Sequence, residues 1–255
     1  MHQRLNSSDR LGNFPEQSRV VRKLESIAEL SEKEKQALLD LPVSVRNVAA
    51  DQDIVCDKDR PSHSCLVLDG FVCRYKLLDG GMRQIMSFQT PGDMPDLQSL
   101  FLRVMDHSIG TLTPSKLAFV PHDAVRDLLR RYPNLVEAFW RDTLIDAAIF
   151  REWMVGLGRR EAYGRVAHLM CELLMRLRAV GLANGYSYEL PLTQAELADA
   201  LGLSTVHVNR VLKELRLDGL VVFKGRHLVI QDWEGLKEAG EFDPTYLHVE
   251  PQVAA

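Results

Sequence analysis

Near its C-terminus the chain reads Leu192-Thr-Gln-Ala-Glu-Leu-Ala-Asp-Ala-Leu-Gly-Leu-Ser-Thr-Val-His-Val-Asn-Arg-Val-Leu-Lys-Glu-Leu-Arg216. Thr193 followed by Glu196 forms a capping box that begins a helix, and Gly202 suits the residue that leaves this helix with a positive φ. Ser204 is a second N-cap, and apolar residues follow it at helical spacing: Val208, Val211, Leu212 and Leu215. The stretch predicts two short amphipathic helices joined by a tight turn.

The second helix has a polar face beside its apolar stripe, and this face suits the major groove of DNA. A guanidinium can pair with a guanine edge, an asparagine amide with adenine, and a valine with a thymine methyl group. We predict base contacts from Thr205, Val206, Asn209 and Arg210. Phosphate contacts fix the register of a protein on DNA without reading sequence. We predict them from Thr193, Gln194, Ser204, His207 and Lys213.

Two β-rich runs follow, in Leu220-Val-Val-Phe-Lys-Gly-Arg-His-Leu-Val-Ile230. Gly225 lies where a hairpin turn needs a glycine, so the segment predicts the wing of a winged helix. Lys224 and Arg226 at its tip are further predicted phosphate contacts. A helical hairpin that serves only as core or protein contact would leave this segment unexplained.

From Pro191 to Gln231 the sequence resembles the DNA-binding domain of the Crp/Fnr family, to which the cyclic-AMP receptor protein belongs. Four motifs carry the resemblance: Leu192-Thr-Gln-Ala-Glu-Leu-Ala198, Gly202-Leu-Ser204, Val208-Asn-Arg-Val-Leu212 and Asp218-Gly-Leu220. The resemblance implies a transcription regulator that binds double-stranded DNA as a homodimer, on a two-fold-symmetric operator, with RNA polymerase as a further partner. Val206 stands where a carboxylate often reads cytosine in this family, so the operators of its best-known members are not assumed.

The composition is that of a chain with two domains and little overall basic charge. The 255 residues carry a formal charge of -4 and a pI near 6.1. Five cations oppose four anions from 190 to 230, and five oppose two from 159 to 180. The electrostatic attraction to phosphates is therefore small per chain, which favours a dimer. Because no signal peptide and no run of 18 apolar residues is present, we expect a cytoplasmic protein without a membrane partner.

Between Val43 and Pro121 the chain consists of short β-rich runs separated by turn residues. Turns are expected at Asp69-Gly70, Asp79-Gly80-Gly81 and Pro91-Gly92-Asp93, and the runs at 54–56, 64–75, 83–88, 109–112 and 116–120. Such a pattern favours a sandwich or barrel. It resembles the β-roll (double-stranded β-helix) sensor domain of the same family, so the expected fold class is α+β.

The resemblance implies a cyclic-nucleotide cassette, but the comparable residues depart from it. Pro95 stands in place of a glycine and has no N–H to donate to a phosphate. Asp96 is shorter than the expected glutamate, and His107 replaces an arginine that would neutralise the phosphate. We therefore expect a degenerate cassette without cyclic-AMP control. Its residues are Gly92, Asp93, Pro95, Asp96, His107 and Ser108.

Other effectors and cofactors stay unknown. Relatives that carry an iron-sulfur cluster have most of its thiolates near the N-terminus, where this chain has none, and no Cys-x-x-Cys pair occurs among Cys56, Cys65, Cys73 and Cys171. Haem held by His63, His107 or a cysteine and a redox-active thiol at Cys65 or Cys73 are weaker alternatives. A cupin-like metal site needs a His-x-His pair, which His63, His107 and His122 do not provide. We expect neither a metal site nor catalytic residues, and no enzyme activity.

One long helix, from about Asn134 to Gly156, is apolar on more than one face, which implies a second packing partner. The family resemblance indicates the same helix of a second subunit, and the expected seam is Trp140, Leu144, Ala147, Arg151 and Met154. A core helix of a monomer is the alternative. Gly156 and Gly158 predict a hinge before the next helix, from about Arg159 to Ala179.

The expected organisation has four parts. They are a flexible tail (1–18), a sensor domain with flanking helices (19–132), a dimerisation helix (133–157) and a winged helix-turn-helix domain (158–255). The tail from Pro244 is expected either to extend over the wing or to be disordered. A rival hypothesis is a ligand-binding β-roll whose helical C-terminal domain contacts protein and does not read DNA.

Overall fold

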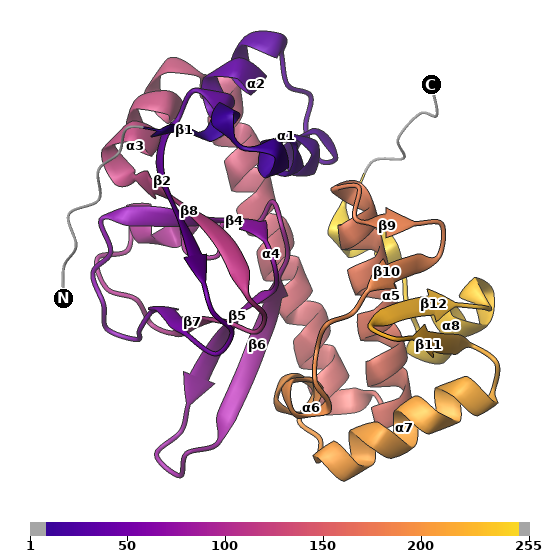
Figure 1. Ribbon diagram of the computed structural model, residues 1–255. Helices are drawn as coiled ribbons and strands as arrows, with labels where there is room; N and C mark the ends of the chain where they lie inside the picture. Colours follow the sequence, from indigo (N-terminus) through magenta and orange to yellow (C-terminus); the bar gives the residue numbers. More distant parts are fainter. Residues whose placement is uncertain (1–8, 250–255) are drawn as a thin grey trace. The chain divides into compact units, whose positions relative to one another are not determined.

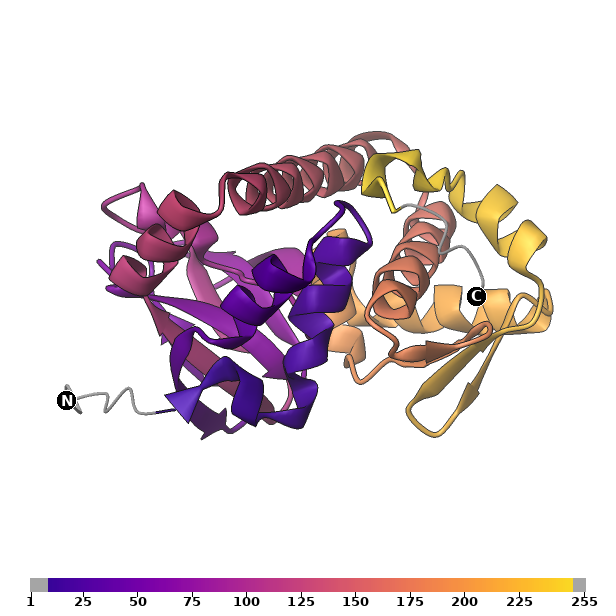
Figure 2. The same cartoon turned by 90° about the horizontal axis from the view of Figure 1, so that it is seen from above.

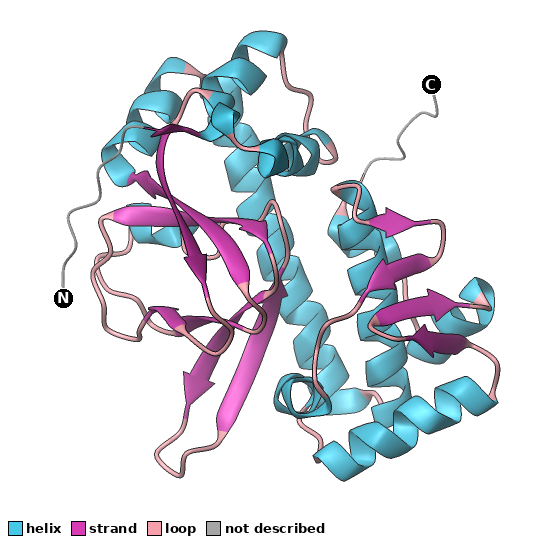
Figure 3. Ribbon diagram, viewed as in Figure 1, coloured by secondary structure: helices cyan, strands magenta, loops and turns pink. Residues whose placement is uncertain are grey.

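The computed structural model describes residues 9–249. They form two compact units. The first contains the described residues up to Tyr75 together with Phe88–Asp142, and the second contains Lys76–Ser87 together with the described residues from Thr143 onward. Each unit combines helices with strands (Figure 3), as the α+β expectation requires.

Two antiparallel sheets enclose the core of the sensor domain. One has the order β1-β2-β8-β4 and the other β3-β7-β5-β6 (Figure 1). The strands are β1 (Asp9–Arg10), β2 (Pro42–Val48), β3 (Asp53–Val55), β4 (His63–Asp69), β5 (Val72–Leu77), β6 (Arg83–Gln89), β7 (Ser108–Thr111) and β8 (Ser115–Pro121). Buried residues from both sheets, such as Val67, Val72, Ile109 and Leu117, pack in one cluster. The expected β-roll is confirmed.

Three helices flank these sheets: α1 (Ser18–Glu25), α2 (Glu32–Leu39) and α3 (His122–Arg131). Short 3-10 turns are η1 (Leu11–Asn13), η2 (Pro15–Gln17) and η3 (Leu97–Leu100). Part of the expected flexible tail is ordered, since Asp9 pairs with Val43 and Leu11 is only 1% exposed. The cause is that Leu11 buries apolar surface against the domain, which a count of polar residues does not reveal. Residues 1–8 lie outside the described part.

Helix α4 (Pro133–Arg159) belongs to the first unit up to Asp142 and to the second from Thr143, and α5 (Ala162–Ala179) follows it in the second unit. The second unit also contains α6 (Gln194–Leu201), α7 (Thr205–Leu217), α8 (Trp233–Gly240) and η4 (Pro244–Leu247), and Figure 2 shows α4 as one continuous rod. A small sheet of order β11-β12-β10-β9 joins the wing strands β11 (Val221–Lys224) and β12 (His227–Ile230) to β10 (Ser187–Glu189) and β9 (Ala183–Asn184). Strands β9 and β10 were not expected. Tyr188 of β10 is buried, and its hydroxyl donates to the Met170 carbonyl of α5 at 2.8 Å. This contact fixes β10 against α5.

The β5–β6 hairpin tip packs within the second unit. Arg83 Nε lies 2.8 Å from the Asp199 carboxylate on α6, and the Gln84 amide donates to the Ala200 carbonyl at 3.3 Å. Residues 76–87 therefore belong to the second unit. Strands β5 and β6, which contain part of this segment, begin or end in the sensor sheet of the first unit.

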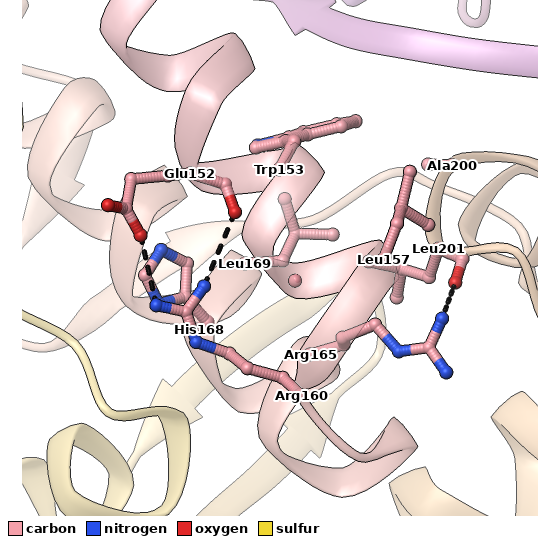
Figure 4. Close-up of a pocket in the computed structure, with 10 residues that line it drawn as sticks. Glu152, Trp153, Leu157, Arg160, Arg165, His168, Leu169, Ala200 and Leu201 are labelled. Atoms are coloured by element: carbon pink, nitrogen blue, oxygen red, sulfur yellow. Dashed lines mark hydrogen bonds and ion pairs between the residues drawn. The ribbon is translucent and has the colours of Figure 1, made fainter.

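The break between α4 and α5 lies later than the sequence indicated. Gly156 and Gly158 are helical, α4 ends at Arg159, and Glu161 occupies the N-cap position of α5. Figure 4 shows the Arg160 side chain turned back to Glu152, whose carboxylate it contacts at 2.9 Å. This ion pair spans the last turns of α4 and stabilises them. Each glycine lowers helix stability by only about 1 kcal/mol relative to alanine, so the helix continues through both. The break between the two helices therefore lies at Arg160 and Glu161, not at the two glycines. That this break acts as a hinge stays a prediction.

A buried polar network connects α4, α5 and the C-terminal segment. Glu172 is 0% exposed, and its Oε2 accepts from Trp153 Nε1 at 3.1 Å and from the Tyr246 hydroxyl at 2.9 Å. Arg176 pairs with the other carboxylate oxygen at 3.2 Å. The tyrosine oxygen also lies 3.0 Å from His168 Nε2. The segment up to Leu247 is therefore ordered against α5, while residues 250–255 lie outside the described part.

Tyr246→Phe is expected to lower the free energy of unfolding by about 1–3 kcal/mol, because it leaves a buried histidine nitrogen and a buried carboxylate each short of a partner. Denaturant unfolding measures the difference. Tyr186→Phe is the matched control, since Tyr186 is exposed on the β9–β10 turn and should change the value by less than about 0.5 kcal/mol. Equal values for the two variants would show that the network contributes nothing.

Candidate nucleic-acid interface

The helix-turn-helix forms as its capping residues predict. Thr193 Oγ1 accepts from the Glu196 amide at 3.2 Å, and the Glu196 carboxylate accepts from the Thr193 amide at 2.6 Å. Gly202 ends α6 with φ +62°. Ser204 Oγ then accepts from the His207 amide at 3.2 Å and begins α7. All of these bonds join residues close in sequence, which is why the sequence alone was sufficient to place both helices.

The face of α7 opposite its buried stripe is exposed. Val208, Val211, Leu212 and Leu215 are buried, whereas the four predicted base-contact residues are exposed. Val206 is 79% exposed and presents an apolar surface on this face. The roles of Thr205, Val206, Asn209 and Arg210 stay predictions, and their side chains are accessible for them.

Polar contacts join this face to its flanking residues. Asn209 Nδ2 donates to Gln194 Oε1 at 3.2 Å, across from α7 to the first residue of α6. Arg210 Nη2 lies 2.9 Å from His207 Nε2, and its Nε lies 3.8 Å from the Glu214 carboxylate. Two residues that the sequence assigned to phosphates thus contact the predicted base readers.

The wing is a tight hairpin with two exposed cations. Lys224 pairs with His227 in the β11–β12 register, and Gly225 takes φ +64° at the turn. Arg226 lies 3.3 Å from Glu189 on β10, and both side chains are more than half exposed. An exposed ion pair of this kind is worth little, so the guanidinium is available to another anion.

The side chains of the sensor cassette are bound to their own chain. Asp96 is 1% exposed, and its carboxylate accepts from the Cys65 amide at 2.7 Å. Arg74 Nε donates to the Pro95 carbonyl at 2.7 Å. Gln98 lies within hydrogen-bond distance of both the Pro95 carbonyl and His107 Nε2. Gly92, with φ +101°, makes the turn before these residues.

The remaining cassette residues are also paired locally. Asp93 contacts Lys23 at 2.6 Å and accepts from the Thr90 amide at 2.6 Å. His107 Nδ1 lies 2.7 Å from Asp106, and Ser108 Oγ accepts from the Asp57 amide at 3.0 Å. A cyclic nucleotide needs N–H donors and a cation for its phosphate. Here the two cations at the cassette, Lys23 and Arg74, already contact Asp93 and the Pro95 carbonyl.

Lys23 and Arg74 are the residues that sequence reasoning missed. The Lys23 ammonium bridges Asp93 and Asp142, 2.6 and 2.8 Å from their carboxylates, and so connects α1, the cassette turn and α4. No sequence motif predicts this arrangement, because the three residues are far apart in sequence. A lysine on a helix with buried neighbours is the only local signal, and most such lysines are solvated.

Three of the four cysteines are buried: Cys65, Cys73 and Cys171. Burial raises the pKa of the Cys65 thiol well above its usual value and that of Cys171 to about 12, which disfavours the reactive thiolate. Between residues 9 and 249, no three His, Cys, Asp or Glu side chains converge on a position for a metal ion.

Helix α4 has a stripe of exposed apolar side chains. Trp140 is 63% exposed, Leu144 50% and Met154 71%, while the opposite side buries Phe139, Ile145, Ile149 and Trp153. Arg151 is exposed and Ala147 is partly exposed along the same stripe. These residues are the predicted seam, and their apolar side chains are accessible to a partner.

Comparison with protein families follows this division of the chain. A cyclic nucleotide-binding domain model matches residues 45–132, and a Crp-like helix-turn-helix domain model matches residues 164–239. The chain belongs to the Crp/Fnr family of transcription regulators. The transcriptional activator FnrL of Cereibacter sphaeroides is 27% identical over 216 residues, which cover 82% of this chain and 85% of that protein. The nitrogen fixation regulation protein FixK of Bradyrhizobium diazoefficiens is 31% identical over 61% of this chain and 64% of its own length.

Solved structures agree with this assignment. FixK2 from Bradyrhizobium japonicum superposes with a TM-score of 0.71 and 25% identity, covering 78% of this chain and 98% of that chain. The structure of a CooA variant from Carboxydothermus hydrogenoformans has a TM-score of 0.60 at 18% identity and covers 87% and 95% of the two chains, which shows a shared fold. Within residues 9–249 of this Crp/Fnr protein, no helix has the length and apolar character needed to cross a membrane.

Asp96 should make the stability of this Crp/Fnr regulator depend on pH. Burial raises the pKa of its carboxyl to about 7, against the lowering effects of the Cys65 amide bond and nearby Arg74. The folded state holds this proton in a range where the unfolded state has released it, so stability falls as pH rises from about 4 through 7. Asp96→Asn keeps the acceptor for the Cys65 amide and cannot ionise. At pH 8 it should therefore avoid a loss in the free energy of unfolding on the order of 2–4 kcal/mol.

Denaturant unfolding of both proteins at pH 5 and pH 8 measures this effect. The Asp96→Asn variant should exceed the parent in stability by much more at pH 8 than at pH 5. Asp79→Asn in the exposed hairpin turn is the control and should keep the parent's pH slope. A parent protein whose stability does not fall between these pH values would contradict the prediction.

Proposed function

We propose that this protein is a homodimeric transcription regulator that reads a two-fold-symmetric operator with α7 of each subunit. The observation that carries the proposal is the exposed face of α7, which presents an arginine, an asparagine and a valine together. Such a face offers a guanine contact, an adenine contact and a thymine-methyl contact within about two helical turns. Its regulatory partner is double-stranded DNA, with RNA polymerase as a further partner.

The stripe on α4 supports pairing of two subunits along this helix. Trp140, Leu144 and Met154 would be removed from water by the same helix of a second copy, in line with the apolar character of dimer interfaces. Two copies of α7 then meet successive major grooves about 34 Å apart, as dimeric helix-turn-helix proteins require. The small excess of positive charge in the helix-turn-helix domain also gives a single copy only weak attraction to DNA phosphates, which favours binding by two copies.

The sensor domain in this proposal does not bind cyclic AMP. Its cassette carboxylates are occupied by Lys23 and by the Cys65 amide, and Pro95 presents a carbonyl to Arg74 and lacks an N–H. Titration calorimetry with cyclic AMP should give no binding heat. Saturable micromolar binding would overturn this part of the proposal and leave the DNA-reading part untouched.

Selection from a random double-stranded DNA library tests the DNA-reading part. We expect an enriched inverted repeat with half-sites about one helical turn apart, bound by two chains per duplex. The rival hypothesis, a β-roll module whose C-terminal domain contacts only protein, gives no enriched sequence. An enriched site without two-fold symmetry would contradict the dimeric arrangement.

Replacing the stripe with charges should separate the subunits. Trp140→Glu combined with Met154→Glu places like charges at an apolar contact, so we expect a monomer in analytical ultracentrifugation. Its affinity for the selected duplex should fall at least about 100-fold, since each half-site is then bound separately. Met154→Leu is the control and should stay dimeric. A double variant that sediments like the parent would show that another surface pairs the subunits.

A further inference from the structure

We propose that Gln194 and His207 are positioning residues that orient Asn209 and Arg210 for base reading, and that they do not act mainly as phosphate contacts. This inference rests on the proposed function, because it concerns how the same face of α7 selects bases. It starts from the two side-chain contacts that join each flanking residue to a predicted reader.

The contact between Gln194 and Asn209 determines which way the asparagine amide faces. Asn209 Nδ2 donates one hydrogen to Gln194 Oε1 at 3.2 Å, which leaves its second N–H and its Oδ1 pointing to solvent. Adenine recognition uses this pair, one N–H toward N7 and one oxygen toward the N6 amino group. With Gln194 Oε1 in this position, a flipped Asn209 amide would place two acceptors against each other, so the reverse order requires the glutamine amide to turn as well. The pair that the structure shows therefore has the asparagine in the orientation that reads adenine.

The backbone holds Gln194 in place for this role. It is the first residue of α6, directly after the Thr193 and Glu196 capping box. The Thr193 hydroxyl donates to the Glu196 carboxylate at 2.9 Å, so this helix start is fixed before DNA arrives. The backbone of Gln194 is therefore fixed, and only its exposed side chain has to be ordered to meet Asn209 on α7. Preorganisation of this kind reduces the entropy lost on binding.

His207 restrains the guanidinium in the same way. Arg210 Nη2 lies 2.9 Å from His207 Nε2, where the arginine must donate, so the imidazole carries its proton on Nδ1. Glu214, one turn further along α7, attracts the guanidinium from the other side at 3.8 Å. The exposed pair with Glu214 is worth little, so the contact with His207 is the one that orients the arginine, and it leaves N–H groups for guanine O6 and N7.

Matched substitutions at position 194 separate positioning from phosphate binding. Gln194→Met removes the acceptor and keeps the length of the side chain. Gln194→Glu keeps an acceptor for Asn209 Nδ2 but repels a phosphate. Base preference is measured by competition between the selected duplex and single-base variants, with Asn209→Ala marking the base pair that Asn209 reads.

We expect Gln194→Met to reduce the preference at that base pair at least threefold, with affinity for unrelated DNA unchanged. Gln194→Glu should retain the preference while binding every duplex more weakly. The inference is overturned if Gln194→Met weakens all duplexes equally with the preference intact, or if Gln194→Glu loses the preference as Gln194→Met does. A parent protein with no base preference would instead contradict the proposed function.

Position 207 gives an independent test of the same kind. His207→Lys adds a cation for phosphate but repels Arg210, whereas His207→Gln keeps an acceptor. We expect His207→Lys to reduce the preference at the base pair that Arg210→Ala identifies, at least threefold, and to bind unrelated DNA more tightly with a steeper salt dependence. His207→Gln should keep most of the preference. If His207→Lys retains the full preference, His207 does not position Arg210.

Discussion

Replacing Lys23 with methionine is expected to lower the free energy of unfolding by about 3–5 kcal/mol, the usual cost of removing one partner from a buried ion pair. Burial lowers the pKa of the Lys23 amine, but the carboxylates of Asp142 and Asp93 outweigh that effect and raise it. The ammonium is thus charged at every physiological pH. Without it, two largely buried carboxylates, 6% and 16% exposed, lose a cation that both contact.

Denaturant unfolding at pH 7 measures this loss, with Lys33→Met on the exposed side of α2 as the control. The deficit should shrink as the pH falls below about 4, where both aspartates can take up a proton. Lys23→Met combined with Asp93→Asn and Asp142→Asn should recover much of the stability, because no buried charge is then left unpaired. A single variant as stable as the control would show that the bridge is not formed in solution.

The second large effect is expected for Arg210→Ala. It should lower affinity for the selected duplex by about 1–3 kcal/mol per half-site, and therefore by about 2–6 kcal/mol for a dimer that uses both. The reason is that a bidentate guanine contact is lost in each major groove. Affinity for unrelated DNA should fall far less, because only one cation per subunit is removed.

Fluorescence anisotropy with the selected duplex and its single-base variants measures both quantities. Lys213→Ala is the matched control, since Lys213 lies on the same exposed helix and is predicted to contact only phosphate. It should weaken all duplexes by a similar factor and lower the salt slope by about one per subunit. If Arg210→Ala behaves like Lys213→Ala, Arg210 does not read a base.

The reading head was predictable because its determinants are local. The capping box at Thr193, the N-cap at Ser204, the positive φ of Gly202 and the turn glycine of the wing each act over three or four residues. A pattern of four or five letters therefore contains the whole physical cause. The boundary between α4 and α5 was less predictable, because Arg160 reaches back eight residues to Glu152 and helix continues through two glycines.

The sequence by itself determined the family, the two helices of the reading head and the wing, and it predicted a degenerate cyclic-nucleotide cassette. Only the tertiary structure showed which groups contact the cassette residues and which residues contact the predicted base readers. Lys23 lies 70 residues from Asp93 and 119 from Asp142 along the chain, and Gln194 lies 15 residues from Asn209. Such contacts depend on how separately formed elements pack, because side-chain electrostatics acts through space whereas capping and turn preferences act along the chain.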